Sequence, residues 1–328
     1  MRRLPIALLA LSALVPALVI ACGGDEKTTS TQNPQPTTGL TPTATGTTPV
    51  PEPTATGTGT STEQPPPPEP EWVAPVVATT SAACGTGKAR PVGTELVLAS
   101  GRKFHVWGPT NYDENKTYPV VFMFHGLGAD GPAFASWFEM EKYVEGEAFV
   151  VYGSAATVGA SWQPGAQSEL DYFDQVVQRL GTEYCINPSR LLAFGFSWGG
   201  SMASALACKR AGYIKALAIG AGSWGGGLTG CGRLPVIGAN RTADTNETVL
   251  MGTNTAKKWA AYNKCSTSTT PSDPGMNCQT WGGCKNPGSV TFCEDTSDMS
   301  TIPGYSPDWN HTVRENYRSF IWSWFKAL

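Results

Sequence analysis

The chain has 328 residues, a formal net charge of −3 and nine cysteines. This length allows one large domain or two small ones. The weak acidity argues against nucleic acid as a partner, because proteins that bind nucleic acid need a basic face to neutralise phosphates.

The first 22 residues predict an export signal. Arg2 and Arg3 form a positive start, residues 6–20 are apolar, and Ala21 precedes Cys22. A small residue before the cleavage site is typical of signal peptides, and the cysteine directly after it resembles the bacterial lipobox. We therefore expect Cys22 to become a lipidated N-terminus that anchors the chain to a membrane. An ordinary signal peptide with a chance cysteine is the alternative.

Residues 23–83 predict a tether. Thr, Pro, Gly and Ser dominate most of this stretch, and without apolar side chains nothing offsets the entropy lost on folding. Gly23 rather than Asp follows Cys22, which favours an extracytoplasmic protein at the bacterial outer membrane or cell surface, or released from it.

Residues 84–328 predict one domain with an even number of cysteines. In an exported protein, this number implies up to four disulfides. We expect the last four cysteines to pair among themselves, and their spacing argues against a zinc site. The eight cysteines are Cys84, Cys185, Cys208, Cys231, Cys265, Cys278, Cys284 and Cys293.

Strands and helices alternate along this domain. Continuous apolar runs such as residues 119–124 are typical of strands buried on both faces of a parallel sheet. The pattern predicts an α/β fold with a mostly parallel, doubly wound sheet flanked by helices. The expected strands are 95–99, 103–108, 119–124, 148–152, 190–196, 214–219 and 234–239, and the expected helices are 168–180, 201–209 and 314–326.

A Gly-x-Ser-x-Gly motif lies at the end of the strand expected at 190–196. In Gly195-Phe196-Ser197-Trp198-Gly199 the serine lies between a predicted strand and a predicted helix, which is the context of a nucleophile elbow. The turn is so tight that the positions two residues away must lack a Cβ. Ser197 is therefore the predicted nucleophile of an α/β hydrolase.

A serine hydroxyl needs a base, and the chain has three histidines. In this fold the order along the chain is serine, acid, histidine. Only His311 follows Ser197, so His311 is the predicted base. His105 and His125 come too early.

The acid must lie between the serine and the histidine. Asp244 follows the strand expected at 234–239, where it would orient His311 and stabilise the imidazolium. Asp295, Asp298 and Asp308 are rivals on other loops.

The sequence His125-Gly126-Leu127-Gly128 follows another buried strand. Such a loop can aim a backbone N–H at a carbonyl oxygen, and the residue after the nucleophile supplies a second donor. We expect the N–H groups of Leu127 and Trp198 to form the oxyanion hole.

Residues 84–328 resemble carbohydrate esterase family 1, which includes feruloyl esterases, acetylxylan esterases and related poly(3-hydroxybutyrate) depolymerases. The matching stretches are residues 119–126, residues 184–190 and the elbow, with Trp259, Asn263, Cys265 and the segment 283–293 after the acid loop. Two loops depart from the family: Asn240-Arg241 replaces a His-Gly pair, and Val313-Arg314 replaces Trp-Pro.

The resemblance implies a serine carboxylic-ester hydrolase acting on feruloyl or acetyl esters of plant polysaccharide. A poly(3-hydroxybutyrate) depolymerase is the alternative. A peptidase on the same fold and a non-catalytic binding lipoprotein are hypotheses from other classes. Aromatic rings on loops can stack on a sugar or a feruloyl ring, so we expect His125, Trp162, Trp224 and Trp309 to contact the substrate.

The sequence suggests no cofactor and no metal, because no glycine-rich phosphate motif follows a strand and the histidines are scattered. The expected partners are a polymeric ester substrate and, through Cys22, a membrane. We expect a monomer, although nothing in the sequence specifies the oligomeric state.

Overall fold

In the computed structural model of the chain, the described residues are 77–157, 159–273, 275–285, 288–303 and 310–328. The predicted export signal, Cys22 and most of the predicted tether lie outside these residues. The described part begins inside the predicted tether, and it is folded there. Ser81 donates its hydroxyl to the carbonyl of Tyr184 at 2.8 Å, and the N–H of Ala83 donates to Gly181. The domain therefore begins before Cys84, earlier than predicted.

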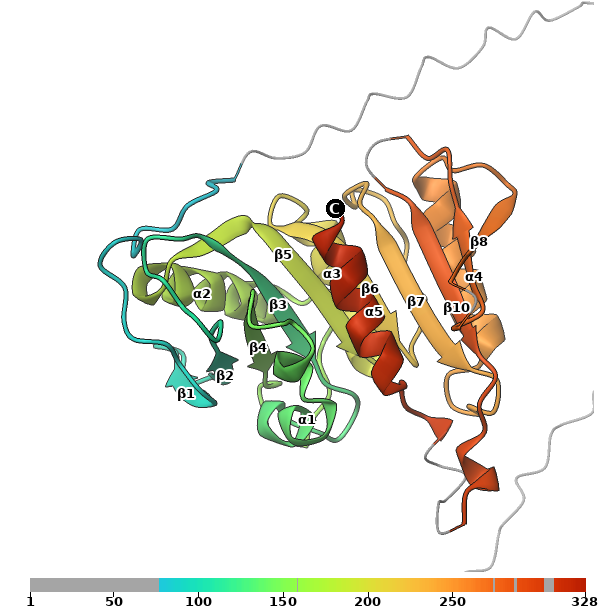
Figure 1. Cartoon of the computed structure of the whole chain (residues 1–328), viewed down its shortest axis with the longest axis horizontal. Coiled ribbons are helices and arrows are strands. Elements are labelled where there is room, and N and C mark those ends of the chain that lie inside the picture. The colour runs from blue at the N-terminus through green and yellow to red at the C-terminus, as the bar shows by residue number, and fades with distance from the viewer. Residues whose placement is uncertain (1–76, 158, 274, 286–287, 304–309) are drawn as a thin grey trace, which may run out of the picture. The chain divides into compact units, whose positions relative to one another are not determined.

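Ten strands form one sheet, and five α-helices lie among the described residues (Figure 1). The strands are β1 (Thr94–Val97), β2 (Lys103–Trp107), β3 (Tyr118–Phe124), β4 (Phe149–Gly153), β5 (Ile186–Phe196), β6 (Ile214–Gly220), β7 (Val236–Arg241), β8 (Thr269–Asp273), β9 (Cys278–Trp281) and β10 (Val290–Asp295). The helices are α1 (Gly131–Phe138), α2 (Gln167–Glu183), α3 (Trp198–Lys209), α4 (Val249–Tyr262) and α5 (Glu315–Lys326).

The strand order is β1-β2-β4-β3-β5-β6-β7-β10-β9-β8. The strands from β4 to β10 in this order pair in parallel, and the pairings nearer the two edges are antiparallel. The prediction of a mostly parallel, doubly wound α/β sheet is confirmed. Buried on both sides, the parallel strands consist mainly of apolar residues: β3 reads Tyr-Pro-Val-Val-Phe-Met-Phe, and six of its seven residues are buried.

Helices cover both faces of this sheet. On one face α2, α3 and α4 pack against side chains such as Phe122 of β3. On the other face α1 and α5 pack against the alternate side chains, including Met123 of the same strand. In Figure 1, α5 crosses in front of the central strands. The period-2 alternation of β3 thus supplies two separate cores.

The chain reverses its direction of winding at β3 and β5. These two strands are neighbours, but from β3 the chain goes to β4 on one side, and from β5 it goes to β6 on the other. In open α/β sheets, ligands bind outside the carboxyl ends of the strands at such a switch point. The segments that follow β3 and β5, beginning at His125 and Ser197, meet there.

Four disulfides join the eight cysteines: Cys84–Cys185, Cys208–Cys231, Cys265–Cys284 and Cys278–Cys293. The last four cysteines pair among themselves, as predicted. Cys278 and Cys293 lie opposite each other on the antiparallel strands β9 and β10.

The sequence interpretation missed α1, α4 and the strands β8 to β10. The signal for each helix was a cap: the side chain of Asp130 accepts from the N–H of Ala133 at α1, and Thr248 accepts from Met251 at α4. The segment that holds the last four cysteines contains β10, which pairs with β7 and extends the parallel sheet. That pairing is set by contacts distant in sequence.

Candidate active site

Ser197 lies on the turn between β5 and α3 with φ 53° and ψ −124°. This left-handed conformation is strained for a residue with a side chain. The two flanking glycines are required by close approaches of backbone to backbone. A Cβ on Gly195 would overlap the carbonyl of Gly199, and a Cβ on Gly199 would overlap the carbonyl of Phe124 at the end of β3. The elbow therefore presents Ser197 at the carboxyl end of the sheet.

The side chains of Ser197, His311 and Asp244 lie in one hydrogen-bonded series. His311 Nε2 is 2.8 Å from Ser197 Oγ, and His311 Nδ1 is 2.8 Å from Asp244 Oδ2. The three residues come from the segments after β5, after β7 and before α5. With Nδ1 donating to the carboxylate, Nε2 is left to accept the proton of the serine hydroxyl.

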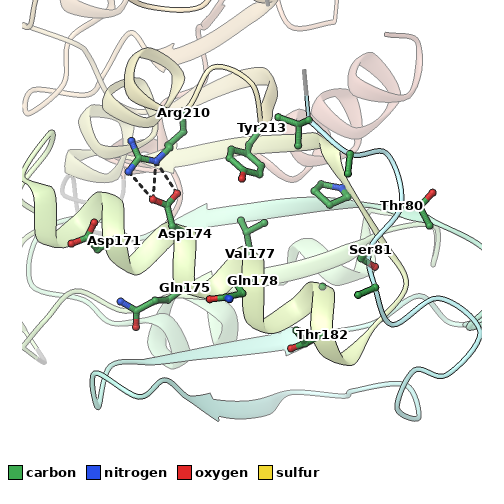
Figure 2. A pocket seen from close by; sticks show the side chains of 15 residues that line it. Thr80, Ser81, Asp171, Asp174, Gln175, Val177, Gln178, Thr182, Arg210 and Tyr213 are labelled. Atoms are coloured by element: carbon green, nitrogen blue, oxygen red, sulfur yellow. Dashed lines mark hydrogen bonds and ion pairs between the residues drawn. The ribbon is translucent and has the colours of Figure 1, made fainter. Parts of the chain in front are cut away.

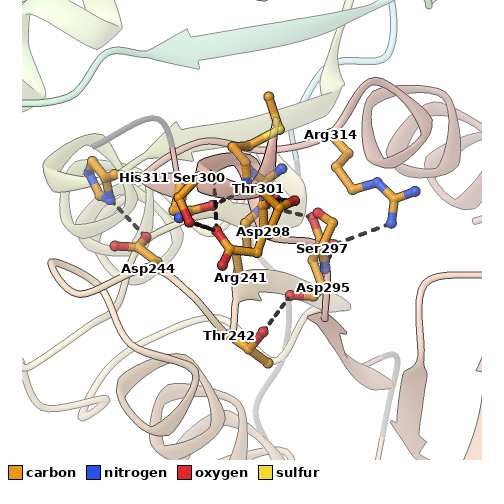
Figure 3. A network of polar contacts seen from close by, with 12 residues as sticks. Arg241, Thr242, Asp244, Asp295, Ser297, Asp298, Ser300, Thr301, His311 and Arg314 are labelled. Carbon is orange, nitrogen blue, oxygen red and sulfur yellow. Dashed lines mark hydrogen bonds and ion pairs between the residues drawn. The ribbon is translucent and has the colours of Figure 1, made fainter. Parts of the chain in front are cut away.

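Asp244 is held rigidly by its own loop. Its side chain has no exposed surface, and its Oδ1 accepts from the N–H groups of Asn246 at 2.9 Å and Glu247 at 3.1 Å. Figure 3 shows its carboxylate pointing at the ring of His311. Because both oxygens accept hydrogen bonds, the carboxylate keeps one orientation toward the histidine.

The rival acids have other partners. Asp295 forms ion pairs with Arg241 and with Arg314, each at 3.2 Å (Figure 3). Asp298 accepts from Ser300 and from Asn310 Nδ2. Asp308 lies outside the described residues.

The departure Asn240-Arg241 has a structural role. Arg241 is 1% exposed and pairs with the buried Asp295 at the end of β10, and Asn240 donates to the carbonyl of Glu247 at 2.8 Å. These contacts join the loops after β7 and β10, and so support the loop that carries Asp244.

The loop of His311 is anchored by its neighbour Asn310, which the sequence interpretation missed. Asn310 is buried, and its side chain accepts from the N–H of Met299 at 2.7 Å and donates to Asp298 at 2.8 Å. Nothing in the local sequence indicated this residue, because its partners lie on another loop.

The predicted oxyanion donors are on the two segments that meet at the switch point. Leu127 is 72% exposed and Trp198 is 43% exposed. Within the described part of the chain, neither backbone N–H donates to another group. A Cβ on Gly126 would lie 3.2 Å from Cβ of Ser197, so the loop after β3 contacts the serine. The N–H of Trp198 is the first of α3, where the helix favours negative charge.

The structure corrects the prediction that His125 and Trp162 contact the substrate, because both side chains are buried. His125 Nδ1 donates to the carbonyl of Gly126 at 2.8 Å, and its Nε2 accepts from the N–H of Ala155 at 3.2 Å. The indole of Trp162 donates to the carbonyl of His125 at 3.0 Å. These bonds fix the loop after β3.

The indole of Trp198 continues this network by donating to the carbonyl of Trp162 at 2.8 Å. Its ring is therefore held while part of its surface remains exposed. Trp224 is half-buried against the core near α4, and its backbone N–H donates to Thr255 Oγ1 at 2.9 Å. Trp309 lies outside the described residues, so its predicted role stays a prediction.

A hollow of about 990 Å³ opens beside His311. Its walls come from α1, from the end of β5 and from the start of α5, and they include Trp137, Phe196, Val313 and Arg318. Trp137 is 38% exposed, and its ring centroid lies 5.1 Å from that of Phe196, which is 5.1 Å from that of His311. Trp137 is an aromatic residue of the site that the sequence interpretation missed, because its helix was not predicted.

A second hollow of similar size lies on the outer side of α2 (Figure 2). Arg210 and Asp174 form a bidentate ion pair in it, beside Tyr213. Its residues Pro188 and Tyr213 lie near the amino ends of the parallel strands. Since Ser197 is at the opposite end of the sheet, this hollow is separate from the candidate active site.

Among the described residues, no group of three or more His, Cys, Asp or Glu side chains is arranged to hold a metal ion. No helix in the described ranges combines the length and the apolar character needed to cross a membrane.

The chain is similar in sequence to proteins named as feruloyl esterases. It is 26% identical over 244 residues to a probable feruloyl esterase C of Aspergillus clavatus. The aligned region covers 70% of this chain and 88% of that protein. It is also 26% identical over 228 residues to feruloyl esterase D of Neurospora crassa, and that alignment covers 62% of this chain and 74% of that protein. The resemblance stated from the motifs is confirmed, although no protein-family model matches the chain.

Solved structures share the fold. An acetyl xylan esterase from Aspergillus awamori superposes with a TM-score of 0.52 at 16% identity, over 73% of this chain and all of that chain. A thermostable esterase gives 0.51 at 15% identity, over 73% of this chain and 62% of that one. The α/β-hydrolase fold predicted from the elbow is confirmed.

The first prediction concerns Asp244. Asp244→Asn should lower kcat for a chromogenic ester about 10⁴-fold, because the amide favours the wrong histidine tautomer. Asp171→Asn, an exposed carboxyl on α2, is the matched control and should change kcat less than about twofold. A loss below about tenfold in Asp244→Asn would mean that another group orients His311.

The second prediction concerns His125. Burial lowers the pKa of His125 below its ordinary value of 6.5, so near that pH the ring binds fewer protons in the folded protein than in the unfolded chain. As pH falls through about 6.5 the unfolded chain binds more protons, and stability that is complete above this pH is lost.

The free energy of unfolding in urea should therefore decrease between about pH 7.5 and 5.5. His125→Gln should show a shallower decrease. Part of the decrease in unfolding free energy should remain in this variant, because desolvation also lowers the pKa of His105. Equal pH slopes in the two proteins would show that His125 does not contribute.

Proposed function

We propose that this chain is a serine carboxylic-ester hydrolase that cleaves feruloyl or acetyl esters of plant polysaccharide. The observation that carries the proposal is the hydrogen-bonded series Ser197–His311–Asp244 at a strained elbow. The similarity to proteins named feruloyl esterases supports the substrate class.

Acylation begins when the ester carbonyl lies against Ser197. His311 Nε2 removes the hydroxyl proton as Oγ attacks the carbonyl carbon, and Asp244 stabilises the resulting imidazolium. The N–H groups of Leu127 and Trp198 stabilise the negative charge on the carbonyl oxygen. His311 then gives its proton to the oxygen of the departing alcohol, which leaves an acyl group on Ser197.

Deacylation repeats these steps with water. His311 removes a proton from the water molecule as its oxygen attacks the acyl carbon. The second tetrahedral intermediate collapses, the proton returns to Ser197 Oγ, and the free acid leaves. Apart from the attacking water, the side chains of the triad and the two backbone donors carry out both halves.

A polyester is the second candidate substrate. Leu127, Trp137 and Trp198 are large apolar side chains with substantial exposed surface near Ser197, and such a rim suits a flat apolar polymer. Poly(3-hydroxybutyrate) is therefore included in the assay below.

The four disulfides require an oxidising compartment, which supports an extracellular protein. The anchoring of the domain to a membrane through lipidated Cys22, with the tether predicted over residues 23–83, remains a proposal from the sequence.

The third prediction tests the reaction. The full-length protein should hydrolyse p-nitrophenyl butyrate and methyl ferulate, and Ser197→Ala should lower kcat at least about 10⁴-fold by removing the nucleophile. Ser201→Ala, one turn further along α3, is the matched control and should retain activity.

The pattern of substrates separates the alternatives. Faster cleavage of poly(3-hydroxybutyrate) than of feruloylated or acetylated xylan would favour the polyester reading. Cleavage of a p-nitroanilide at a comparable rate would indicate a peptidase. Absence of ester turnover in folded protein would contradict the enzymatic proposal and favour a binding lipoprotein.

The fourth prediction tests the anchor. In a bacterial host that processes lipoproteins, the wild-type chain should partition into the detergent phase of Triton X-114. Cys22→Ser should move it to the aqueous phase or block its processing, because the acylated residue is lost. Equal partition of both proteins would contradict lipidation at Cys22.

A further inference from the structure

We propose that the hollow beside His311 binds the alcohol portion of the ester and selects one that carries a carboxylate, such as a uronic acid. This inference rests on the proposed ester hydrolysis and names its substrate class more closely. Arg318 is the residue that would recognise the carboxylate.

Arg318 is a buried cation without a carboxylate partner. It is 7% exposed and lines the hollow. Its Nε is buried and has no acceptor, and no carboxylate of the described residues forms an ion pair with it. A buried guanidinium stays protonated, and leaving its charge unpaired costs free energy. An anion entering the hollow would remove that cost.

The fold compensates this charge only in part. Arg318 Nη1 donates to the carbonyl of Phe138 at 2.8 Å, and its Cζ lies 4.6 Å from the centroid of the Phe138 ring. Phe138 is the last residue of α1, and the carboxyl end of a helix carries roughly half a negative charge. These contacts hold the guanidinium in place, and none of them is with a carboxylate.

The other charged side chains that line the hollow form no ion pair with Arg318. Arg241 and Arg314, which also line the hollow, both pair with Asp295. Glu315 lies one turn before Arg318 on α5, at the rim, and its side chain is exposed. A carboxylate in the hollow would therefore find Arg318 as the buried cation that has no acidic partner.

The position of the hollow selects the alcohol rather than the acyl group. His311 forms one wall, and this residue gives its proton to the oxygen of the leaving alcohol. Trp137, which also lines the hollow, offers exposed aromatic surface, and an aromatic ring packs well against the face of a sugar. A stacked sugar with a carboxylate directed at Arg318 fits both features.

The acid released by the reaction is a poorer candidate for this site. Its carboxyl carbon is the former ester carbonyl carbon, which lies at Ser197 between the oxyanion donors. The carboxylate that Arg318 would bind must therefore belong to the other half of the substrate.

The test compares two feruloyl esters that differ only in the alcohol, methyl glucuronoside and methyl glucoside, acylated at the same ring hydroxyl. At about pH 7 the uronate is ionised. The full-length protein should cleave the uronate ester with kcat/KM about tenfold higher, the effect of one charge-assisted hydrogen bond. Arg318→Gln should bring this ratio close to one. Lys326→Gln, which removes an equal charge near the other end of α5, should preserve it.

The ratio is measured within each protein, so a general loss of activity does not affect it. If Arg318→Gln fails to fold, inhibition of the wild-type protein decides: methyl glucuronoside should inhibit hydrolysis of methyl ferulate at about tenfold lower concentration than methyl glucoside.

Equal kcat/KM values, or equal inhibition, would overturn the carboxylate subsite and leave the esterase proposal intact. A uronate preference that persists in Arg318→Gln would overturn the assignment to Arg318. Absence of hydrolysis of both esters and of methyl ferulate would instead be a failure of the proposed function.

Discussion

The close approach of three backbone segments at the end of β5 is the constraint on which the rest of the site depends. Ser197 adopts a positive φ, and Gly195 and Gly199 have backbone atoms where a Cβ would otherwise lie. Such strain costs on the order of 1–3 kcal/mol. It is sustained by the buried strands β3, β5 and β6 on either side of the turn.

The loops around the serine are fixed by hydrogen bonds to main-chain groups. His125, Trp162 and Trp198 form a relay of side chain to carbonyl that joins the loop after β3 to the first residue of α3. This relay leaves the N–H groups of Leu127 and Trp198 without partners in the described chain. Preorganised donors of this kind lower the cost of stabilising charge during a reaction.

On the other side of the site, ion pairs form at two positions where the sequence departs from carbohydrate esterase family 1, Arg241 and Arg314. Arg241 and Arg314 share Asp295, so the loops after β7 and β10 and the start of α5 are connected. Arg318 lines the same hollow without a carboxylate partner among the described residues. The proposed specificity rests on this difference between Arg318 and the two paired arginines.

The sequence by itself determined the features that depend on local order. The elbow needs Gly-x-Ser-x-Gly between a strand and a helix, and a single histidine follows it, so Ser197 and His311 could be named from the sequence. The apolar runs of β3 to β7 gave the parallel sheet, because strands covered on both faces have that composition.

Only the tertiary structure decided what depends on distant contacts. The burial of His125 and Trp162, the place of Trp137 in the site and the pairing of β10 with β7 all arise from segments far apart in the chain. The lack of an acidic partner for Arg318 also depends on where every other charge is placed. A residue type states which interactions are available, and packing selects which of them are made.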